Sequence, residues 1–362
     1  MNKNVNIYHS EANDAHKRIN MIKIIVDAMG GDNSPFVNVE GAVKAVNAYS
    51  DLHVTLVGPQ SQLNELLGKY KFDNKRLAIL GAEDVITCND RPTEAIRSKT
   101  ESSLYKAYEL LRSSDEYGGL VSIGSTGAIL VGAITRLGRI KGVSRPALVP
   151  VVPTLSDGGL VALCDSGANA ECYSYQIDQF ATMGSYYLEK AFGVKNPRVG
   201  LLNIGTEENK GDNLRKETYQ LLKQNKHVNF IGNAEARDYL SGKFDLIVCD
   251  GFSGNILLKA TEGACLDTMK LVKGAMLKNL KTKIGALLLK KDLYAVKNKM
   301  DYNNYGGAAL LGVTKTVVKG HGSSKSKAVF KCIEQAYNME KSGLRVAITE
   351  GLKEETKNDN LA

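Results

Sequence analysis

Short apolar segments alternate with longer amphipathic segments along most of the chain. The apolar segments are rich in Val, Ile and Leu, and they cover residues 22–26, 54–57, 77–80, 120–123, 148–152, 160–163, 199–204, 228–231 and 246–248. Apolar strands that alternate with helices are typical of a parallel sheet with both faces covered. The pattern therefore predicts an α/β protein with a doubly wound, mainly parallel sheet.

One part of the chain is predicted to be antiparallel. Between Ala147 and Cys164, two apolar segments flank the sequence TLSDGG at 154–159. Such a run of Ser, Asp and Gly favours a tight reversal of the chain. We expect the two flanking segments to pair as antiparallel strands.

A second departure lies between 253 and 300, where no strand separates two helical patterns. Apolar residues recur at helical spacing, first at Met269, Val272, Met276 and Leu280, and then at Ile284, Leu287, Leu288 and Val296. Two successive helices without a strand predict a helical hairpin that projects from the sheet.

These patterns divide the chain into three parts. Residues 1–20 lack the apolar core of a signal peptide and are expected to form a disordered extension. Residues 21–345 are predicted to form the α/β domain, including an amphipathic helical hairpin at 263–300, and residues 346–362 a C-terminal tail. No segment looks apolar enough to span a membrane.

The net charge of +8 comes from one segment. Nine lysines, no arginine and a single acid, Asp292, lie between Lys270 and Lys299, whereas the rest of the chain holds 38 basic and 38 acidic residues. The positive segment therefore indicates an acidic partner at that place. The absence of arginine argues against nucleic acid, which is recognised largely through bidentate arginine contacts.

The cysteines and histidines do not predict a metal site. The six cysteines lie far apart, without a C-x-x-C pair or a nearby histidine at ligand spacing. We interpret them as scattered core residues in a reducing compartment. Neither a metal nor a cofactor is predicted, and the chain also lacks a G-x-S-x-G nucleophile motif and an H-E-x-x-H helix.

The first chemical motif is DAMGGD, which follows the first apolar segment. Gly30 and Gly31 would let a ligand approach the main chain closely at the carboxyl end of a strand. Asp27 would orient a substrate or, alternatively, only form the turn. Ser34 and Pro35 are a plausible cap and first residue of the next helix.

The second motif is SIGSTGA, in which a strand leads into a glycine-rich helix start. Unpaired main-chain N–H groups and the positive end of a helix converge there, and small side chains leave space for an anion. The predicted phosphate site is formed by Ser125, Thr126, Gly127 and Ala128. The motif lacks the Gly-Lys-Ser/Thr of nucleoside triphosphatases, and a plain tight turn is the alternative.

Further polar loops follow later strands. These are DSGAN with Asn169, the glycine-rich loop NIGTEENKG with Lys210, and DGFSGN with Asn255, followed by Lys259. If they emerge at one edge of one parallel sheet, they line a single cleft. The HGSS sequence near the end adds His321, either as an acid, base or phosphate donor or as a structural residue, with Ser323 as a possible helix cap.

The ordered blocks resemble the bacterial phosphate acyltransferase family, PlsX. The blocks are DAMGGD, SIGSTGA, RPA, DSGAN, VGLLNIGTEENKG, DGFSGN, YGGAALLG and HGSS, and they extend from Met21 to about Met339. Ile123 and Ser125, where a small residue and Asn are expected, and Ala309, where Pro is frequent, depart mildly from the pattern. The departure at Ser125 affects only the contact that the Ser125 side chain itself is expected to make with the ligand.

The resemblance implies an activity and partners. Members transfer a fatty acyl group from acyl-acyl carrier protein to inorganic phosphate, which yields acyl phosphate for phospholipid synthesis. They are cytoplasmic homodimers with peripheral membrane contact and a fold like that of phosphotransacetylases and isopropylmalate dehydrogenases. The resemblance also implies Lys210 as a cation near phosphate and Asn255 as a donor to an oxyanion or to phosphate.

The lysine-rich hairpin has three interpretations. It could meet an anionic membrane, dock the acidic carrier protein, or pack only on a second copy of the chain. The residues expected to make membrane or carrier-protein contact are Lys273, Leu277, Leu280, Lys281, Lys283, Ile284, Leu287, Leu288, Lys290 and Lys291.

Three rival functions remain open from the sequence. A phosphotransacetylase-like enzyme would use coenzyme A thioesters in place of the carrier protein. A nicotinamide-dependent decarboxylating dehydrogenase would need a metal-binding carboxylate cluster, which the sequence does not show. A basic scaffold without enzymatic activity would leave the many polar strand ends unexplained.

Overall fold

The computed structural model describes residues 21–299 and 305–359, so the expected extension at 1–20 and Met300 at the end of the expected hairpin lie outside the described residues. The strands are β1 (Ile22–Asp27), β2 (Leu52–Gly58), β3 (Leu77–Gly81), β4 (Tyr117–Ser122), β5 (Ala147–Val149), β6 (Val151–Pro153), β7 (Leu160–Cys164), β8 (Arg198–Asn203), β9 (Asn229–Glu235), β10 (Leu246–Val248), β11 (Ala308–Leu311) and β12 (Thr316–Lys319).

Most helices connect successive strands, and the last two come after the final strand. They are α1 (Phe36–Ala48), α2 (Gln60–Leu67), α3 (Pro92–Ser98), α4 (Ser103–Ser113), α5 (Thr126–Gly132), α6 (Ser174–Phe192), α7 (Asn213–Gln224), α8 (Gly251–Met276), α9 (Leu280–Leu288), α10 (Lys290–Lys299), α11 (Ser326–Lys341) and α12 (Leu344–Asp359). A π-helical turn, Ala133–Leu137, directly continues α5. The α/β class predicted from the alternation is confirmed.

The strands form two sheets rather than the one that the alternation suggested. One has the order β3-β2-β1-β4-β12-β11-β5 and the other the order β6-β7-β10-β8-β9. The expected strand at 148–152 is divided at Pro150, where the chain leaves the first sheet and enters the second. Proline has no N–H to donate to a ladder, so a strand is readily interrupted there.

The predicted antiparallel pair is confirmed by the pairing of β6 with β7. The pairs β1–β2, β1–β4, β4–β12, β7–β10 and β8–β10 are parallel. The antiparallel strand β11, within the YGGAALLG block, was not expected as a strand. It has only four residues, too few to show a periodic pattern.

One hydrophobic core runs through both sheets. It joins Val26 and Val318 of the first sheet to Ala162 and Leu201 of the second, and α1, α6 and α11 cover it. A second cluster lies on the opposite face of the first sheet, under α3, α4 and α5. Both faces of the first sheet are therefore covered, as a doubly wound fold requires.

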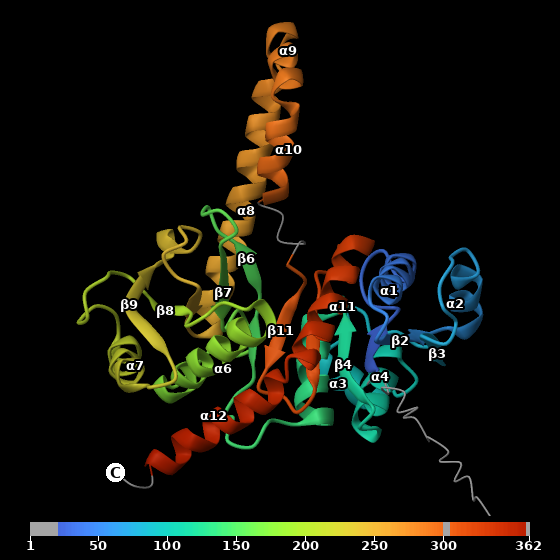
Figure 1. The fold of residues 1–362 in the computed structure, drawn as a ribbon, viewed down its shortest axis with the longest axis horizontal. Helices are drawn as coiled ribbons and strands as arrows, with labels where there is room; N and C mark the ends of the chain where they lie inside the picture. Colours follow the sequence, from blue (N-terminus) through green and yellow to red (C-terminus); the bar gives the residue numbers. More distant parts are fainter. Residues whose placement is uncertain (1–20, 300–304, 360–362) are drawn as a thin grey trace, which may run out of the picture.

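The helical hairpin projects from the second sheet, as predicted (Figure 1). Asp250 caps the start of α8, because its side chain accepts a hydrogen bond from the Ser253 N–H at 2.9 Å. Leu280 was expected to extend the first helix, but α8 ends at Met276. Asn279 starts the return arm because its side chain accepts from the Thr282 N–H at 3.0 Å, and that arm comprises α9 and α10.

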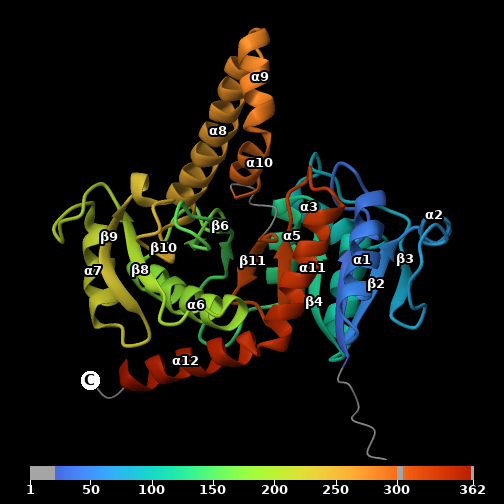
Figure 2. The same cartoon turned by 45° about the horizontal axis from the view of Figure 1, so that its top comes forward.

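The C-terminal part of the chain is helical. Helix α12 covers residues that were expected to form a tail, and the boundary expected at 345 falls inside it. It packs against α6 beneath the two sheets (Figure 2). Leu344, Ile348 and Leu352 belong to the core that runs through both sheets, and each is at most 3% exposed.

We predict that the start of α12 contributes to stability. Ile348→Ala should lower the free energy of unfolding by roughly 2–5 kcal/mol, because it removes buried methyl groups from a packed site. Val346→Ala is the matched control, since Val346 is 54% exposed on the same helix. Denaturant unfolding would measure both changes, and an equal effect of the two substitutions would show that α12 is not part of the core.

Candidate active site

Three loops meet at the carboxyl ends of β1, β4 and β12. A Cβ added to Gly30 would lie 2.8 Å from the Gly124 nitrogen, so no larger residue fits between the first two loops. The Asp32 N–H donates to the Gly322 carbonyl at 2.9 Å. The Gly320 N–H donates to the Ser122 carbonyl, also at 2.9 Å. The DAMGGD, SIGSTGA and HGSS sequences are therefore neighbours in space.

Asp27 lies beneath these loops. Its carboxylate accepts hydrogen bonds from the hydroxyls of Ser103 at 2.6 Å and Ser122 at 2.7 Å, and it is only 3% exposed. Burial raises the pKa of Asp27, while these hydrogen bonds act in the opposite direction. In this arrangement Asp27 supports the loop from below and is covered by protein. The close contact between the loops is also enough to require a glycine at position 30, whether or not a ligand binds there.

The expected cap of α1 is not formed. The helix begins at Phe36 with Pro35 in the capping position and without a side-chain cap. The Ser34 hydroxyl instead donates to the carbonyls of Met29 and Gly31, at 2.9 and 2.8 Å. Gly31 has a φ of +91°, which favours glycine, and these bonds hold the turn that it forms.

The start of α5 presents unpaired donors. The first hydrogen bond of the helix runs from the Ile129 N–H to the Ser125 carbonyl at 3.0 Å. Within the described part of the chain, the N–H groups of residues 125–128 have no acceptor, and the hydroxyls of Ser125 and Thr126 have no partner. Residues 125–127 are half-buried. This is the arrangement of donors that the sequence predicted for an anion.

A second group of loops lies at the carboxyl ends of β7, β8 and β10. Asp165 organises the first loop by accepting from the N–H groups of Ala168 at 3.0 Å and Asn169 at 2.7 Å. The Asn169 amide donates to Asp165 at 3.0 Å and to the Pro146 carbonyl at 2.7 Å. Both amide hydrogens of Asn169 are thus engaged in holding the loop, so this side chain retains only its oxygen for other partners.

Asn255 is the fifth residue of α8 and faces this loop. A Cβ added to Gly167 would be 3.6 Å from the Asn255 side chain, which is ordinary contact distance. The Gly251 N–H donates to the Asn169 carbonyl at 2.8 Å and joins the two segments. The Asn255 amide has no hydrogen-bond partner among the residues that the structure describes, so its donors are available.

Lys210 lies in the loop between β8 and α7. The Asn203 amide donates to the Lys210 carbonyl at 3.1 Å, and the lysine itself is exposed. Nearby, Arg215 pairs with Asp250 and donates to the Ser253 hydroxyl at 2.9 Å, which ties α7 to the start of α8. No hydrogen bond or ion pair in the described ranges joins Lys210 to the start of α5.

His321 forms part of a turn. Its Nδ1 lies 2.8 Å from the Ser323 hydroxyl and accepts from the Ser323 N–H at 3.2 Å. The expected cap at Ser323 is wrong, because α11 begins at Ser326 with Lys325 in the capping position. His321 is exposed at the edge of the first group of loops, and its Nε2 is the ring nitrogen left for another partner.

The predicted site residues therefore follow strands of two sheets, not one edge of one sheet. Asp27, Gly30, Gly31, Ser125, Thr126, Gly127, Ala128 and His321 belong to the first group of loops. Asn169, Lys210 and Asn255 belong to the second, and Lys259 lies on α8. Lys259 slightly lowers the pKa of Lys319, the last residue of β12.

Lys319 is a residue that sequence reasoning missed. It pairs with Ser122 across β12 and β4, and Ser122 bonds to Asp27, so these three residues form a polar row across three neighbouring strands. The only signal in the sequence is a lysine at the end of the apolar segment TVVK, just before Gly320. A lysine in that position is more often a solvated strand end.

The apolar side chains of the hairpin are exposed. Leu288 is 79% exposed and Leu280 75%, and no residue between Asn255 and Val296 is buried. The remaining expected contact residues, Lys273, Leu277, Lys281, Lys283, Ile284, Leu287, Lys290 and Lys291, are exposed as well. The hairpin therefore presents both leucines and lysines to its surroundings.

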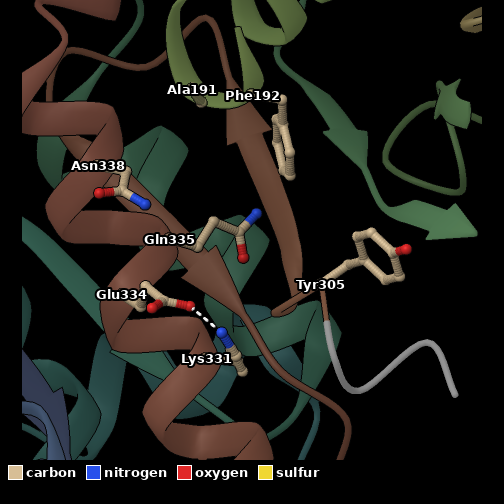
Figure 3. A pocket seen from close by; sticks show the side chains of 7 residues that line it. All are labelled: Ala191, Phe192, Tyr305, Lys331, Glu334, Gln335 and Asn338. Atoms are coloured by element: carbon tan, nitrogen blue, oxygen red, sulfur yellow. Dashed lines mark hydrogen bonds and ion pairs between the residues drawn. The ribbon is translucent and has the colours of Figure 1, made fainter. Parts of the chain in front are cut away.

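A cavity of about 320 Å³ lies elsewhere, between the end of α6 and the middle of α11 (Figure 3). Phe192, Tyr305 and Gln335 line it, and none of its lining residues belongs to the two groups of loops. Among the described residues there is no cluster of three or more His, Cys, Asp or Glu that could hold a metal ion. No helix in that part of the chain is long and apolar enough to cross a membrane.

The fold is that of the phosphotransacetylases. A phosphotransacetylase from Streptococcus pyogenes superposes with a TM-score of 0.59 at 16% identity, covering 88% of this chain and 94% of that one. A branched-chain phosphotransacylase from Enterococcus faecalis gives a TM-score of 0.53 at 15% identity, covering 88% and 98%. At such low identity these likenesses show the architecture alone.

Sequence comparison then identifies the family. Residues 22–347 match the family described as fatty acid synthesis protein. The phosphate acyltransferase of Clostridium novyi is 46% identical over 89% of this chain and 96% of its own length, and that of Bacillus subtilis is 43% identical over 92% and 99%. This chain belongs to the phosphate acyltransferase family, as its motifs indicated.

Proposed function

We propose that this protein transfers a fatty acyl group from acyl-acyl carrier protein to inorganic phosphate and releases acyl phosphate. Its relatives are named phosphate acyltransferases and match nearly the whole chain. The observation that carries the proposal is the start of α5, where four main-chain N–H groups and two hydroxyls lack partners in the described part of the chain. An anion such as phosphate would satisfy these donors.

The reaction needs no nucleophile from the protein. A phosphate oxygen attacks the thioester carbon, the carbonyl oxygen becomes an oxyanion, and the C–S bond then breaks to give acyl phosphate and a thiolate. A thiol has a pKa of about 8.5, so the thiolate leaves readily. Alignment of the two reactants can supply about 7–11 kcal/mol, and one oxyanion donor about 2.7–4 kcal/mol. Positioning of phosphate is therefore the larger contribution.

The residues divide between these two tasks. Residues 125–128 hold phosphate, with the Thr126 hydroxyl as an added donor. The free amide of Asn255 donates to the oxyanion or to phosphate, and Lys210 supplies a cation from the exposed loop after β8. His321, Asn169 and Lys259 are secondary candidates, because Asn169 holds its own loop and His321 its own turn.

We predict that the reaction requires orthophosphate and prefers the carrier-protein donor. With purified protein, acyl-acyl carrier protein should give acyl phosphate faster than the same acyl group on coenzyme A, because the lysine-rich hairpin attracts an acidic protein. Omitting orthophosphate should abolish consumption of either donor. Equal consumption without orthophosphate would refute phosphate as the acceptor, and faster reaction with the coenzyme A thioester would favour the phosphotransacetylase-like alternative.

We predict that Asn255→Ala lowers kcat by roughly 10²–10³-fold, which is the usual effect of removing one oxyanion donor. Lys210→Ala should raise the KM for phosphate, because it removes a cation. Lys216→Ala is the matched control, because Lys216 is also exposed but lies on α7. It should leave kcat and the KM for phosphate unchanged. Near wild-type transfer by both Asn255→Ala and Lys210→Ala would contradict the assignment.

The hairpin is proposed to bind an anionic membrane at its tip, with the carrier protein nearby. Its exposed leucines supply apolar surface, and each lysine near anionic lipid contributes about 1 kcal/mol. Association of two copies of the chain, as the family resemblance implies, is part of the same proposal.

We predict that Leu288→Glu weakens binding to vesicles that contain anionic lipid by roughly tenfold or more, because a charged side chain replaces an exposed apolar one on α9, the helix that begins at the tip. Vesicle flotation would measure it. Val346→Glu is the matched control, since it changes an exposed apolar residue of α12 instead. Flotation of the Leu288→Glu protein at the wild-type level would contradict membrane contact at the tip.

A further inference from the structure

Lys319 lies at the carboxyl end of β12, on the face of the first sheet where α5 begins. Val317 belongs to the hydrophobic cluster that also contains Ala128 and Ile129 of α5. Side chains two residues apart on a strand point to the same face, so Lys319 follows Val317 onto that face. Ser122 pairs with Lys319 on the neighbouring strand, and the unpaired N–H groups begin only three residues after Ser122.

The ammonium group of Lys319 has no counter-charge at hand. The residue is half-buried, and within the described ranges its side chain makes no hydrogen bond and no ion pair. A cation that is partly removed from water without a partner is unfavourable. Lysine is rarely buried unless it is paired. An unpaired, half-buried lysine on the sheet face where α5 begins therefore points to an anion that binds both the ammonium group and the free N–H groups of residues 125–128.

The surroundings of Lys319 contain few charges of either sign. Cys332 of α11, Glu262 and Lys259 of α8, and Cys88 from the loop before α3 are the titratable groups near enough to influence it. Burial, the largest effect, lowers the pKa of Lys319 below the usual value for lysine, and Lys259 acts in the same direction. Glu262, the one carboxylate among these groups, is not within ion-pair distance.

We propose that Lys319 is a catalytic residue that binds the phosphate directly, opposite the N–H groups of residues 125–128, and retains the phosphoryl group of the acyl phosphate product. This inference rests on the proposed function, because it names a further ligand of the same anion. Lys319 differs from Lys210 and Lys259, which are exposed, since its position at a strand end fixes the base of its side chain.

The experiment compares the binding of inorganic phosphate by the full chain and by Lys319→Met, Lys319→Arg and Lys315→Met. Titration calorimetry should show roughly 10- to 100-fold weaker binding for Lys319→Met, the usual effect of losing a hydrogen bond to a charged group. Lys319→Arg should retain most of the affinity. Lys315→Met is the matched control, because Lys315 flanks the opposite end of β12 and bonds to the Tyr117 carbonyl at 3.0 Å.

The pH dependence separates binding from a structural role. As pH rises through the lowered pKa of Lys319, the ammonium loses its proton, so the wild-type KM for phosphate should rise at alkaline pH. In Lys319→Arg this rise should move to higher pH, because arginine stays charged. The titration of phosphate itself is common to both proteins and cancels in the comparison.

The outcomes distinguish this inference from the proposed function. If the wild-type protein neither binds phosphate nor requires it, the proposed function fails. If the wild-type protein binds phosphate and Lys319→Met binds it equally well, only the role of Lys319 is overturned. If Lys319→Met does not fold, the alkaline KM profiles of the wild-type and Lys319→Arg proteins decide, and identical profiles would overturn the inference.

Discussion

The candidate site depends on one steric constraint, the close approach of the main chain at Gly30 to the main chain at Gly124. No side chain fits between the two loops, so the loop after β1 fixes the path of the loop after β4. Asp27 adds to this from below through Ser103 and Ser122, and the Gly322 carbonyl holds the third loop in place. The start of α5 is thereby positioned before any ligand arrives, which is what a site that works by alignment requires.

The polar residues around the site fall into two groups: those that hold its loops in place and those whose donors are available to a ligand. The carboxylates of Asp27 and Asp165 and the amide of Asn169 form hydrogen bonds that hold neighbouring segments of the protein in place. The N–H groups of residues 125–128, the Asn255 amide and the Lys319 ammonium have none within the described part of the chain. Each of these three groups offers N–H donors, as is expected of a site for a polyanionic substrate.

Much of the fold and part of the candidate site were predictable from the sequence. Apolar strands and glycine-rich strand ends leave local patterns, and the DAMGGD and SIGSTGA loops were located correctly at strand ends. The division into two sheets was not predictable, because it depends on the path of the chain at Pro150 and not on hydrophobicity. Lys319 was missed for a related reason, since the single lysine that ends TVVK is linked to the site only when strand pairing places it beside Ser122.

The projecting hairpin has a consequence for how such a protein can diversify. None of its residues from 263 to 296 is buried, and none of them packs against a core cluster, so exchanges along this outer part leave the interior of the molecule untouched. Substitutions there can therefore change the exposed surface of the hairpin without changing the loops of the candidate site. The candidate site and this exposed surface are, in this architecture, separately evolvable parts of the molecule.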